Sequence, residues 1–160
     1  MKTYGAIDIA AWFLDKAATD PAAVKDISNM KLQKLVFFAQ LVSALTYPDQ
    51  TIHCNNTHAW DYGPVVPRLY KLLKEFGGSP LSFANAAVKG AFAAQNPQAI
   101  DDPEALSILS AVWEKFKSWT AIQLSALTHR ADSPWAVVYA ATPYAVITPE
   151  VMRKHGFGRP

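Results

Sequence analysis

The segment at residues 30–46, MKLQKLVFFAQLVSALT, decides the fold of this chain. Its apolar side chains recur at helical spacing but are not confined to one stripe, so they surround most of the predicted helix. An α-helix that is apolar nearly all round is covered by other parts of the protein. Ser28 or Asn29 can begin this helix by accepting hydrogen bonds from its free amides, and Pro48 lies just beyond its end. The segment therefore predicts a central, largely buried helix.

Periodic apolar residues, prolines and capping residues predict further helices on both sides of the central one. Asp102, followed by Pro103, is a strong helix start, and Thr120 with Gln123 has the spacing of a capping box. Helices are predicted over residues 6–19, 68–76, 101–119 and 120–129, with two short ones beginning at Ser133-Pro134 and Thr148-Pro149. The core is expected to contain Leu35, Val36, Leu109, Val112 and Phe116.

Two segments have no clear helical period. Residues 51–62 can form a short extended segment, which would be part of one short hairpin. Residues 79–100 are rich in Ala, Gly, Asn and Pro and are expected to form a long connection. The fold class is therefore all-α or mostly so: a single compact domain of about six helices over residues 1–160.

Composition restricts the function classes. Hydrophobic residues make up 51% of the chain and charged residues only 18%, so the apolar surplus belongs either to a large core or to a surface that meets a partner. The net charge is +2, and the basic residues are spaced as solvated helix faces, which does not favour nucleic acid as a partner. These basic residues are Lys31, Lys34, Arg68, Lys71 and Lys74. No apolar stretch is long enough for a membrane span, so we expect a cytoplasmic protein.

Two polar clusters contain residue types that could form a metal site or a catalytic triad. His53, Cys54 and His58 could ligate a metal, but the sequence has one cysteine and lacks the paired spacing of zinc sites. Ser125 and His129 share a helix face near Asp132, yet neither a nucleophile elbow nor an oxyanion loop accompanies them. Polar loop residues and a structural corner are the simpler readings, so we expect no enzyme, no metal and no cofactor.

Aromatic residues beside turns are the more informative group. Trp60 and Tyr62 flank the turn at Gly63-Pro64, and Trp135 follows Pro134. Such side chains can fill the core, or they can be anchors for a partner, because Trp and Tyr are enriched in binding hot spots. Both alternatives stay open at this point.

Several segments together resemble one family. They are MKLQKLVFFAQ at residues 30–40, AWDYGPVVPRLY at 59–70, LSALTH at 124–129, SPW at 133–135 and ITPE at 147–150. In this order they look like the conserved blocks of the Panacea, or SocA-like, antitoxin domain, which is also found in GepA-like phage-associated proteins. The structural motif residues would be Lys31, Gln33, Lys34, Gly63, Pro64, Pro67 and Pro134. Phe37-Phe38 departs from the commoner Tyr-Tyr pair of the family.

The resemblance implies a helical, protein-binding antitoxin that neutralises a cognate toxin, by direct binding or as an adaptor that delivers the toxin to the ClpXP protease. The alternatives are a nucleic-acid-binding regulator of its own operon and a small hydrolase or metal-dependent enzyme. A small-molecule substrate is not expected. The candidate partner-binding residues are Trp60, Tyr62, Phe83, Phe92, His129 and Trp135. Phe83 and Phe92 are included among these candidates because residues 79–100 match no family block and could adapt to a partner.

Overall fold

A computed structural model describes residues 1–22 and 27–156. These residues form eight α-helices and a single two-stranded hairpin. The elements are α1 (Ala6–Thr19), α2 (Asn29–Thr46), β1 (His58–Trp60), β2 (Gly63–Val65), α3 (Pro67–Leu73) with the 3₁₀ turn η1 (Lys74–Phe76), α4 (Ala86–Ala93), α5 (Pro103–Phe116), α6 (Ala121–Thr128), α7 (Pro134–Ala141) and α8 (Pro149–His155). The predicted class, a mostly all-α compact domain with one short hairpin, is confirmed, although the helices outnumber the six expected.

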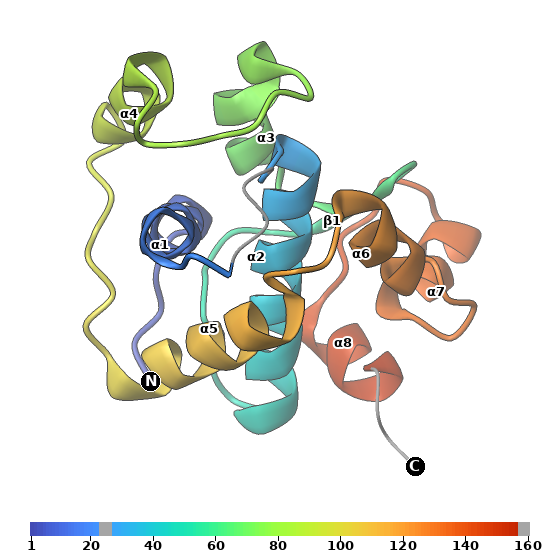
Figure 1. Ribbon diagram of the computed structural model, residues 1–160. Coiled ribbons are helices and arrows are strands. Elements are labelled where there is room, and N and C mark those ends of the chain that lie inside the picture. The colour runs from blue at the N-terminus through green and yellow to red at the C-terminus, as the bar shows by residue number, and fades with distance from the viewer. Residues whose placement is uncertain (23–26, 157–160) are drawn as a thin grey trace.

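Helix α2 runs through the middle of the molecule, with α1 and α5 to one side, α6, α7 and α8 to the other, and α3 and α4 at one end (Figure 1). Fourteen of its residues are buried, as the apolar composition of this helix predicts. The hydroxyl of Ser28 accepts a hydrogen bond from the Lys31 amide and so begins the helix. No helix among the described residues is long and apolar enough to cross a membrane.

An aromatic part of the core lies between α1, α2 and α5. Phe38 of α2 stacks on Phe116 of α5 with ring centroids 4.6 Å apart, and Phe13 of α1 meets Trp113 at 6.3 Å. The core residues predicted from the sequence are all buried. Burial of so many large side chains is the main source of stability in a domain of this size.

The predicted helix starts are confirmed because each depends on short-range hydrogen bonds. Asp102 accepts from the amides of Glu104 and Ala105 at the start of α5. Thr120 and Gln123 form the predicted capping box of α6. The hydroxyls of Ser133 and Thr148 cap α7 and α8 in the same way. Helix α5 is shorter than the predicted span of 101–119, because it begins at Pro103 and finishes at Phe116.

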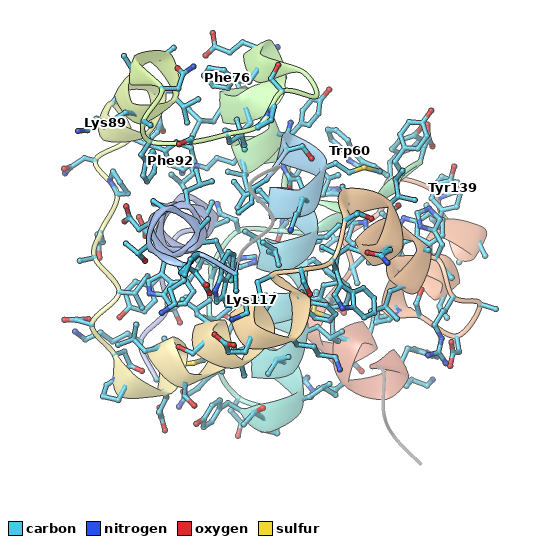
Figure 2. The ribbon with its side chains drawn as sticks, in the orientation of Figure 1. Trp60, Phe76, Lys89, Phe92, Lys117 and Tyr139 are labelled. Carbon is cyan, nitrogen blue, oxygen red and sulfur yellow. The ribbon has the colours of Figure 1, made fainter. Side chains whose placement is uncertain are left out.

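The prediction of a long connection over residues 79–100 is wrong for its middle part, which forms α4. The side chain of Asn85 begins this helix by accepting from the amides of Ala87 and Val88. Phe92 points back toward the rest of the molecule while Lys89 points outward (Figure 2), and Phe92 is 2% exposed. Phe83 packs against Phe92, edge to face, at 5.2 Å. The segment therefore contributes Leu81, Val88 and Phe92 to the core, and these tertiary contacts explain a helix that has no strong sequence period.

The prediction that Lys31 and Lys34 lie on a solvated face is also wrong. Both side chains are buried on α2, with exposed fractions of 0% and 1%. Lys31 Nζ donates a hydrogen bond over 3.0 Å to the carbonyl of Lys117, the C-cap residue that follows α5. A cation at this point satisfies a free carbonyl of the helix end and opposes its partial negative charge. Burial of both lysines reduces the basic surface expected from the sequence.

Candidate partner-binding cleft

The hairpin of β1 and β2 depends on a glycine at its turn. Gly63 has a φ of +110°, which L side chains rarely adopt, and a Cβ there would lie 2.9 Å from the Nζ and Cε atoms of Lys34. Gln33 of α2 fastens the end of the hairpin, because its Oε1 accepts from the Val66 amide over 2.9 Å. Pro67 then occupies the first turn of α3. The turn therefore requires glycine at position 63.

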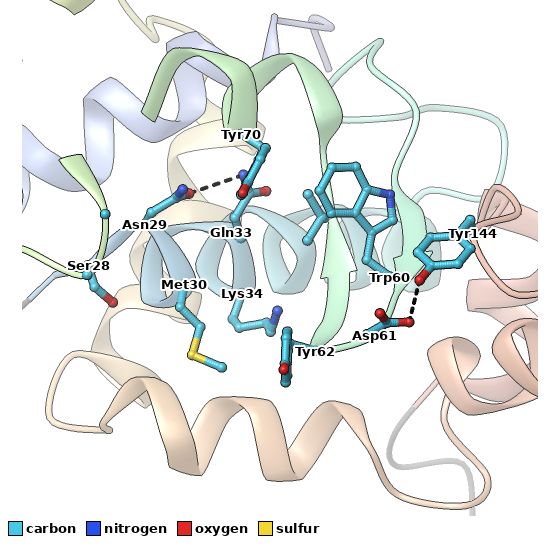
Figure 3. Close-up of a pocket in the computed structure, with 13 residues that line it drawn as sticks. Ser28, Asn29, Met30, Gln33, Lys34, Trp60, Asp61, Tyr62, Tyr70 and Tyr144 are labelled. Carbon is cyan, nitrogen blue, oxygen red and sulfur yellow. Dashed lines mark hydrogen bonds between the residues drawn. The ribbon is translucent and has the colours of Figure 1, made fainter. Parts of the chain in front are cut away.

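A cleft of about 510 Å³ lies between the first turns of α2, the hairpin and α3 (Figure 3). Its volume falls within the range of ligand pockets, roughly 300–1,000 Å³. The lining residues are Ser28, Asn29, Met30, Gln33, Lys34, Trp60, Asp61, Tyr62, Val65, Tyr70, Gly77, Gly78 and Tyr144. Segments that are far apart in the sequence meet here, because Tyr144 reaches the cleft from the loop after α7.

Exposed aromatic side chains gather at this cleft. The described residues contain four large hydrophobic side chains that are exposed, and three of them, Tyr62, Tyr70 and Tyr144, line it. Tyr62 is 77% exposed and Tyr144 is 53% exposed. Trp60 is half-buried and meets Tyr70 edge to face at 5.0 Å. Apolar surface collected in this way marks a site of interaction more often than scattered single residues do.

Asp61 fixes one edge of the cleft. A single carboxylate oxygen, Oδ1, accepts from the hydroxyls of Tyr144 and Tyr139, each over 2.7 Å. These bonds, that of Tyr144 first, hold the pKa of the Asp61 carboxyl below its ordinary value. Tyr144 has a φ of +67°, and its amide donates to the Ala59 carbonyl over 2.8 Å. A non-glycine residue in this conformation persists only where its surroundings hold it, so Tyr144 is presented on a fixed corner.

Lys34 contributes the positive charge of the cleft. Its side chain leaves α2 and ends toward Tyr62 (Figure 3), and its Nζ donates to the Pro64 carbonyl over 3.2 Å. Desolvation lowers the pKa of this ammonium group from 10.5 to about 8, because burial disfavours the charged form. The group is therefore still mainly protonated at neutral pH.

The structure separates the six candidate partner-binding residues into three groups. Trp60 and Tyr62 line the cleft. Trp135 is buried and donates its Nε1 hydrogen to the Trp60 carbonyl over 2.8 Å, so it supports the cleft from behind. Its ring also lies against His129, with centroids 3.9 Å apart. Phe83 and Phe92, the candidates from residues 79–100, do not line the cleft, and Phe92 is buried in the core.

His129 is placed as a structural residue. Its Nδ1 lies 2.6 Å from the Ser125 carbonyl oxygen, which only accepts, so Nδ1 carries a hydrogen and donates it. That nitrogen therefore cannot also act as a base for the Ser125 hydroxyl, 3.5 Å away. Asp132 pairs with Arg130 instead of completing a triad. The geometry gives no activated nucleophile at this corner.

The histidine and cysteine cluster does not converge. His53 is buried, Cys54 is exposed, and His58 Nδ1 donates to the Tyr144 carbonyl over 2.9 Å. Among the described residues no three His, Cys, Asp or Glu side chains are grouped so that they could hold a metal ion. His58 thus helps to position Tyr144 at the edge of the cleft.

Sequence reasoning missed Tyr70, Tyr144 and the cleft-facing role of Lys34. Tyr70 belongs to a block quoted for the family resemblance, but its exposure depends on how α3 is oriented. Tyr144 carries no local signal, because its position depends on Asp61 and Ala59, more than 80 residues earlier in the chain. The two residues come together only in the tertiary structure.

Comparison with known proteins identifies the class of domain. The family model "Antitoxin SocA-like, Panacea domain" matches residues 32–136, which include most of α2, the hairpin and the corner at Pro134. No curated protein and no solved structure matches the chain. The chain belongs to the SocA-like Panacea antitoxin family.

Proposed function

We propose that this protein is an antitoxin that neutralises a cognate toxin by binding it directly, and that it acts in the cytoplasm. The observation that carries the proposal is the cleft, where three of the four exposed large hydrophobic side chains of the described residues gather. Membership of an antitoxin family supports the same conclusion from an independent direction. Tyr and Trp bury large areas at low entropy cost and are enriched in binding hot spots.

The physical character of the cleft supports binding rather than catalysis. Its edges are held by the turn at Gly63 and by the hydrogen bonds of Asp61, so little conformational freedom is lost when a partner binds. Among the described residues that line the cleft, the buried titratable group is the ammonium of Lys34. No pair of a nucleophile and a base lies beside it among these lining residues. A regulator that binds nucleic acid is less well supported, since Lys31 and Lys34 are withdrawn from the surface.

The proposal is tested by co-expression with the product of the adjacent open reading frame. We expect the neighbouring protein to stop growth when expressed alone, and this chain to restore growth and to co-purify with it in a fixed ratio. A neighbour that is harmless, or that stays toxic in the presence of this chain, would contradict the proposal.

The route of neutralisation needs a second host that lacks the ClpX subunit. Direct binding predicts full protection and an unchanged toxin level in that host. An adaptor that delivers the toxin to ClpXP predicts loss of protection there, together with a longer toxin half-life. We expect the first result, because the cleft offers a contact surface that is complete without a protease.

A further inference from the structure

The cleft contains a buried positive charge that no anion of the described chain neutralises. Lys34 is 1% exposed and is one of the residues that line the cleft, with its side chain ending toward Tyr62 (Figure 3). An ammonium has three hydrogens to donate, and its one hydrogen bond, to the Pro64 carbonyl, is long at 3.2 Å. No carboxylate of the described residues lies within 4.0 Å of Lys34 Nζ, the distance that defines an ion pair. Asp61 lines the same cleft, but its Oδ1 already accepts from two tyrosine hydroxyls.

We propose that the cleft binds a segment of the toxin in which an apolar or aromatic side chain stands next to a carboxylate, with the carboxylate accepting from Lys34 Nζ. The inference rests on the proposed function and adds the chemistry of the recognised segment. It assigns Lys34 as the specificity-determining residue and Met30, Trp60 and Tyr70 as the apolar walls.

Charge complementarity is the first argument for this occupant. A buried charge without a partner is costly, and an incoming carboxylate supplies the missing partner where water is largely excluded. Lys34 is not needed to fill space, since an apolar side chain of similar length would fill it without the cost of desolvation. Lys34 is one of the residues that line the open cleft, and its side chain ends toward Tyr62 (Figure 3).

The shape of the site is the second argument, and it favours a protein segment over a free metabolite. Small-molecule sites typically enclose most of their ligand. Here Tyr62 and Tyr144 extend the apolar surface outward from the cleft, with exposed fractions of 77% and 53%. An occupant of the cleft that continues over these tyrosines covers them, as a partner protein does and a small anion does not.

Minimal probes test the chemistry without the toxin. The full chain is titrated with N-acetyltryptophan, which has a carboxylate beside an indole, and with N-acetyltryptophanamide, which lacks the charge, and amide NMR shifts are followed. We expect the acid to bind about tenfold more tightly than the amide, with shifts centred on residues 30–34 and 60–63. Equal affinity for the two probes, no binding of either, or shifts elsewhere would overturn the inference.

Two readouts assign the preference to Lys34. Lys34→Met should reduce the preference for the acid to about onefold, whereas Lys31→Met, which removes the other buried lysine of α2, should keep it. In the wild type the preference should also fall as the pH rises above about 8, where the free ammonium loses its proton. The pH dependence needs no variant, so it decides the matter even if Lys34→Met does not fold. A preference that persists at high pH would overturn the assignment.

The toxin provides the last test. Tyr62→Ala should weaken protection in co-expression, while Ile122→Ala, which removes an equally exposed side chain outside the cleft, should not. If the wild type protects and both Lys34→Met and Tyr62→Ala protect equally well, the inference fails and the proposed function stands. If the wild type does not protect, the proposed function fails, and the probe titrations still decide what the cleft binds.

Discussion

Two buried lysines on the same helix lie in contrasting regions of this molecule. Lys31 faces the junction of α2 and α5, where its ammonium donates over 3.0 Å to the carbonyl of Lys117, the C-cap residue of α5. Lys34, one turn later, faces the cleft and has the Pro64 carbonyl as its acceptor. The first region uses a cation to complete a helix end, and the second keeps a cation beside an open apolar surface. The contrast separates a part of the fold built for stability from a part that retains a destabilising group.

The largest expected effect is on the free energy of unfolding and comes from the contact between α2 and α5. Phe116→Ala should lower the free energy of unfolding by about 3–5 kcal/mol, because the ring stacks on Phe38 in a region without solvent. Urea denaturation followed by circular dichroism measures this change. Ile122→Ala is the control and should stay within about 0.5 kcal/mol, since Ile122 is 77% exposed. A loss at Phe116 as small as that of the control would show that this region is not the main core.

The next effect concerns the turn that forms the cleft. Gly63→Val should cost about 1–3 kcal/mol from the positive φ alone, and its Cβ would also displace the Lys34 side chain. Gly78→Ala is the matched control, because no atom lies within 4 Å of the added Cβ. Thermal unfolding of both variants measures the difference. A Gly63→Val protein as stable as the wild type that only fails to bind its toxin would make the turn a contact site instead of a structural one.

The two lysines are predicted to respond with opposite signs. Lys31→Met should lower the free energy of unfolding by about 1.5–3 kcal/mol, because it leaves the end of α5 without its charged donor. Lys34→Met should raise it by about 1–3 kcal/mol at pH 7, because it removes a buried charge whose one hydrogen bond, to the Pro64 carbonyl, involves no carboxylate. Urea denaturation of the pair checks the signs. Destabilisation by both substitutions would remove the distinction between the two regions.

The same comparison predicts a pH dependence. The folded-state pKa of Lys34 is about 8 and lies below the ordinary value of 10.5. Between these values the folded chain releases a proton that the unfolded chain keeps, so this group makes the protein more stable as the pH rises. The advantage of Lys34→Met over the wild type should therefore shrink between pH 8 and 10.5, by up to about 3 kcal/mol. An advantage that stays constant over this range would contradict the lowered pKa.

These regions also differ in how far the sequence predicts them. The starts of α5, α6, α7 and α8 are predictable because a cap such as Asp102 or Ser133 bonds to amides two or three residues away. The burial of α2 follows from its apolar residues. The burial of Lys31 does not, because its acceptor lies on α5, 86 residues later in the chain.

The cleft itself is the least predictable part. Trp60 and Tyr62 could be identified as candidates because they flank a glycine–proline turn, but their difference in exposure depends on α3 and on Trp135 behind them. Helix α4 was missed for a related reason: its alanines and Gly90 give no period, and the cap of Asn85 together with the contact of Phe83 and Phe92 stabilises it. Local patterns predict helices, whereas contacts between distant segments determine which side chains reach the surface.

The smallest expected effect is at the edge of the cleft and tests whether the corner at Tyr144 is held by charge. Hydrogen bonds to Asp61 are the largest cause of the raised pKa values of Tyr144 and Tyr139. Asp61→Asn removes the negative charge and keeps the shape, so the pKa of both hydroxyls should fall toward the ordinary value of 10.0. Ultraviolet titration of the phenolate measures this, with Tyr62→Phe as the control that removes a tyrosine outside the network. If the Tyr144 corner depends on the carboxylate, Asp61→Asn should also weaken toxin binding more than it changes the melting temperature. Unchanged tyrosine titration would mean that Asp61 does not hold the corner, and the positive φ of Tyr144 together with its amide bond to Ala59 would then have to fix the edge of the cleft alone.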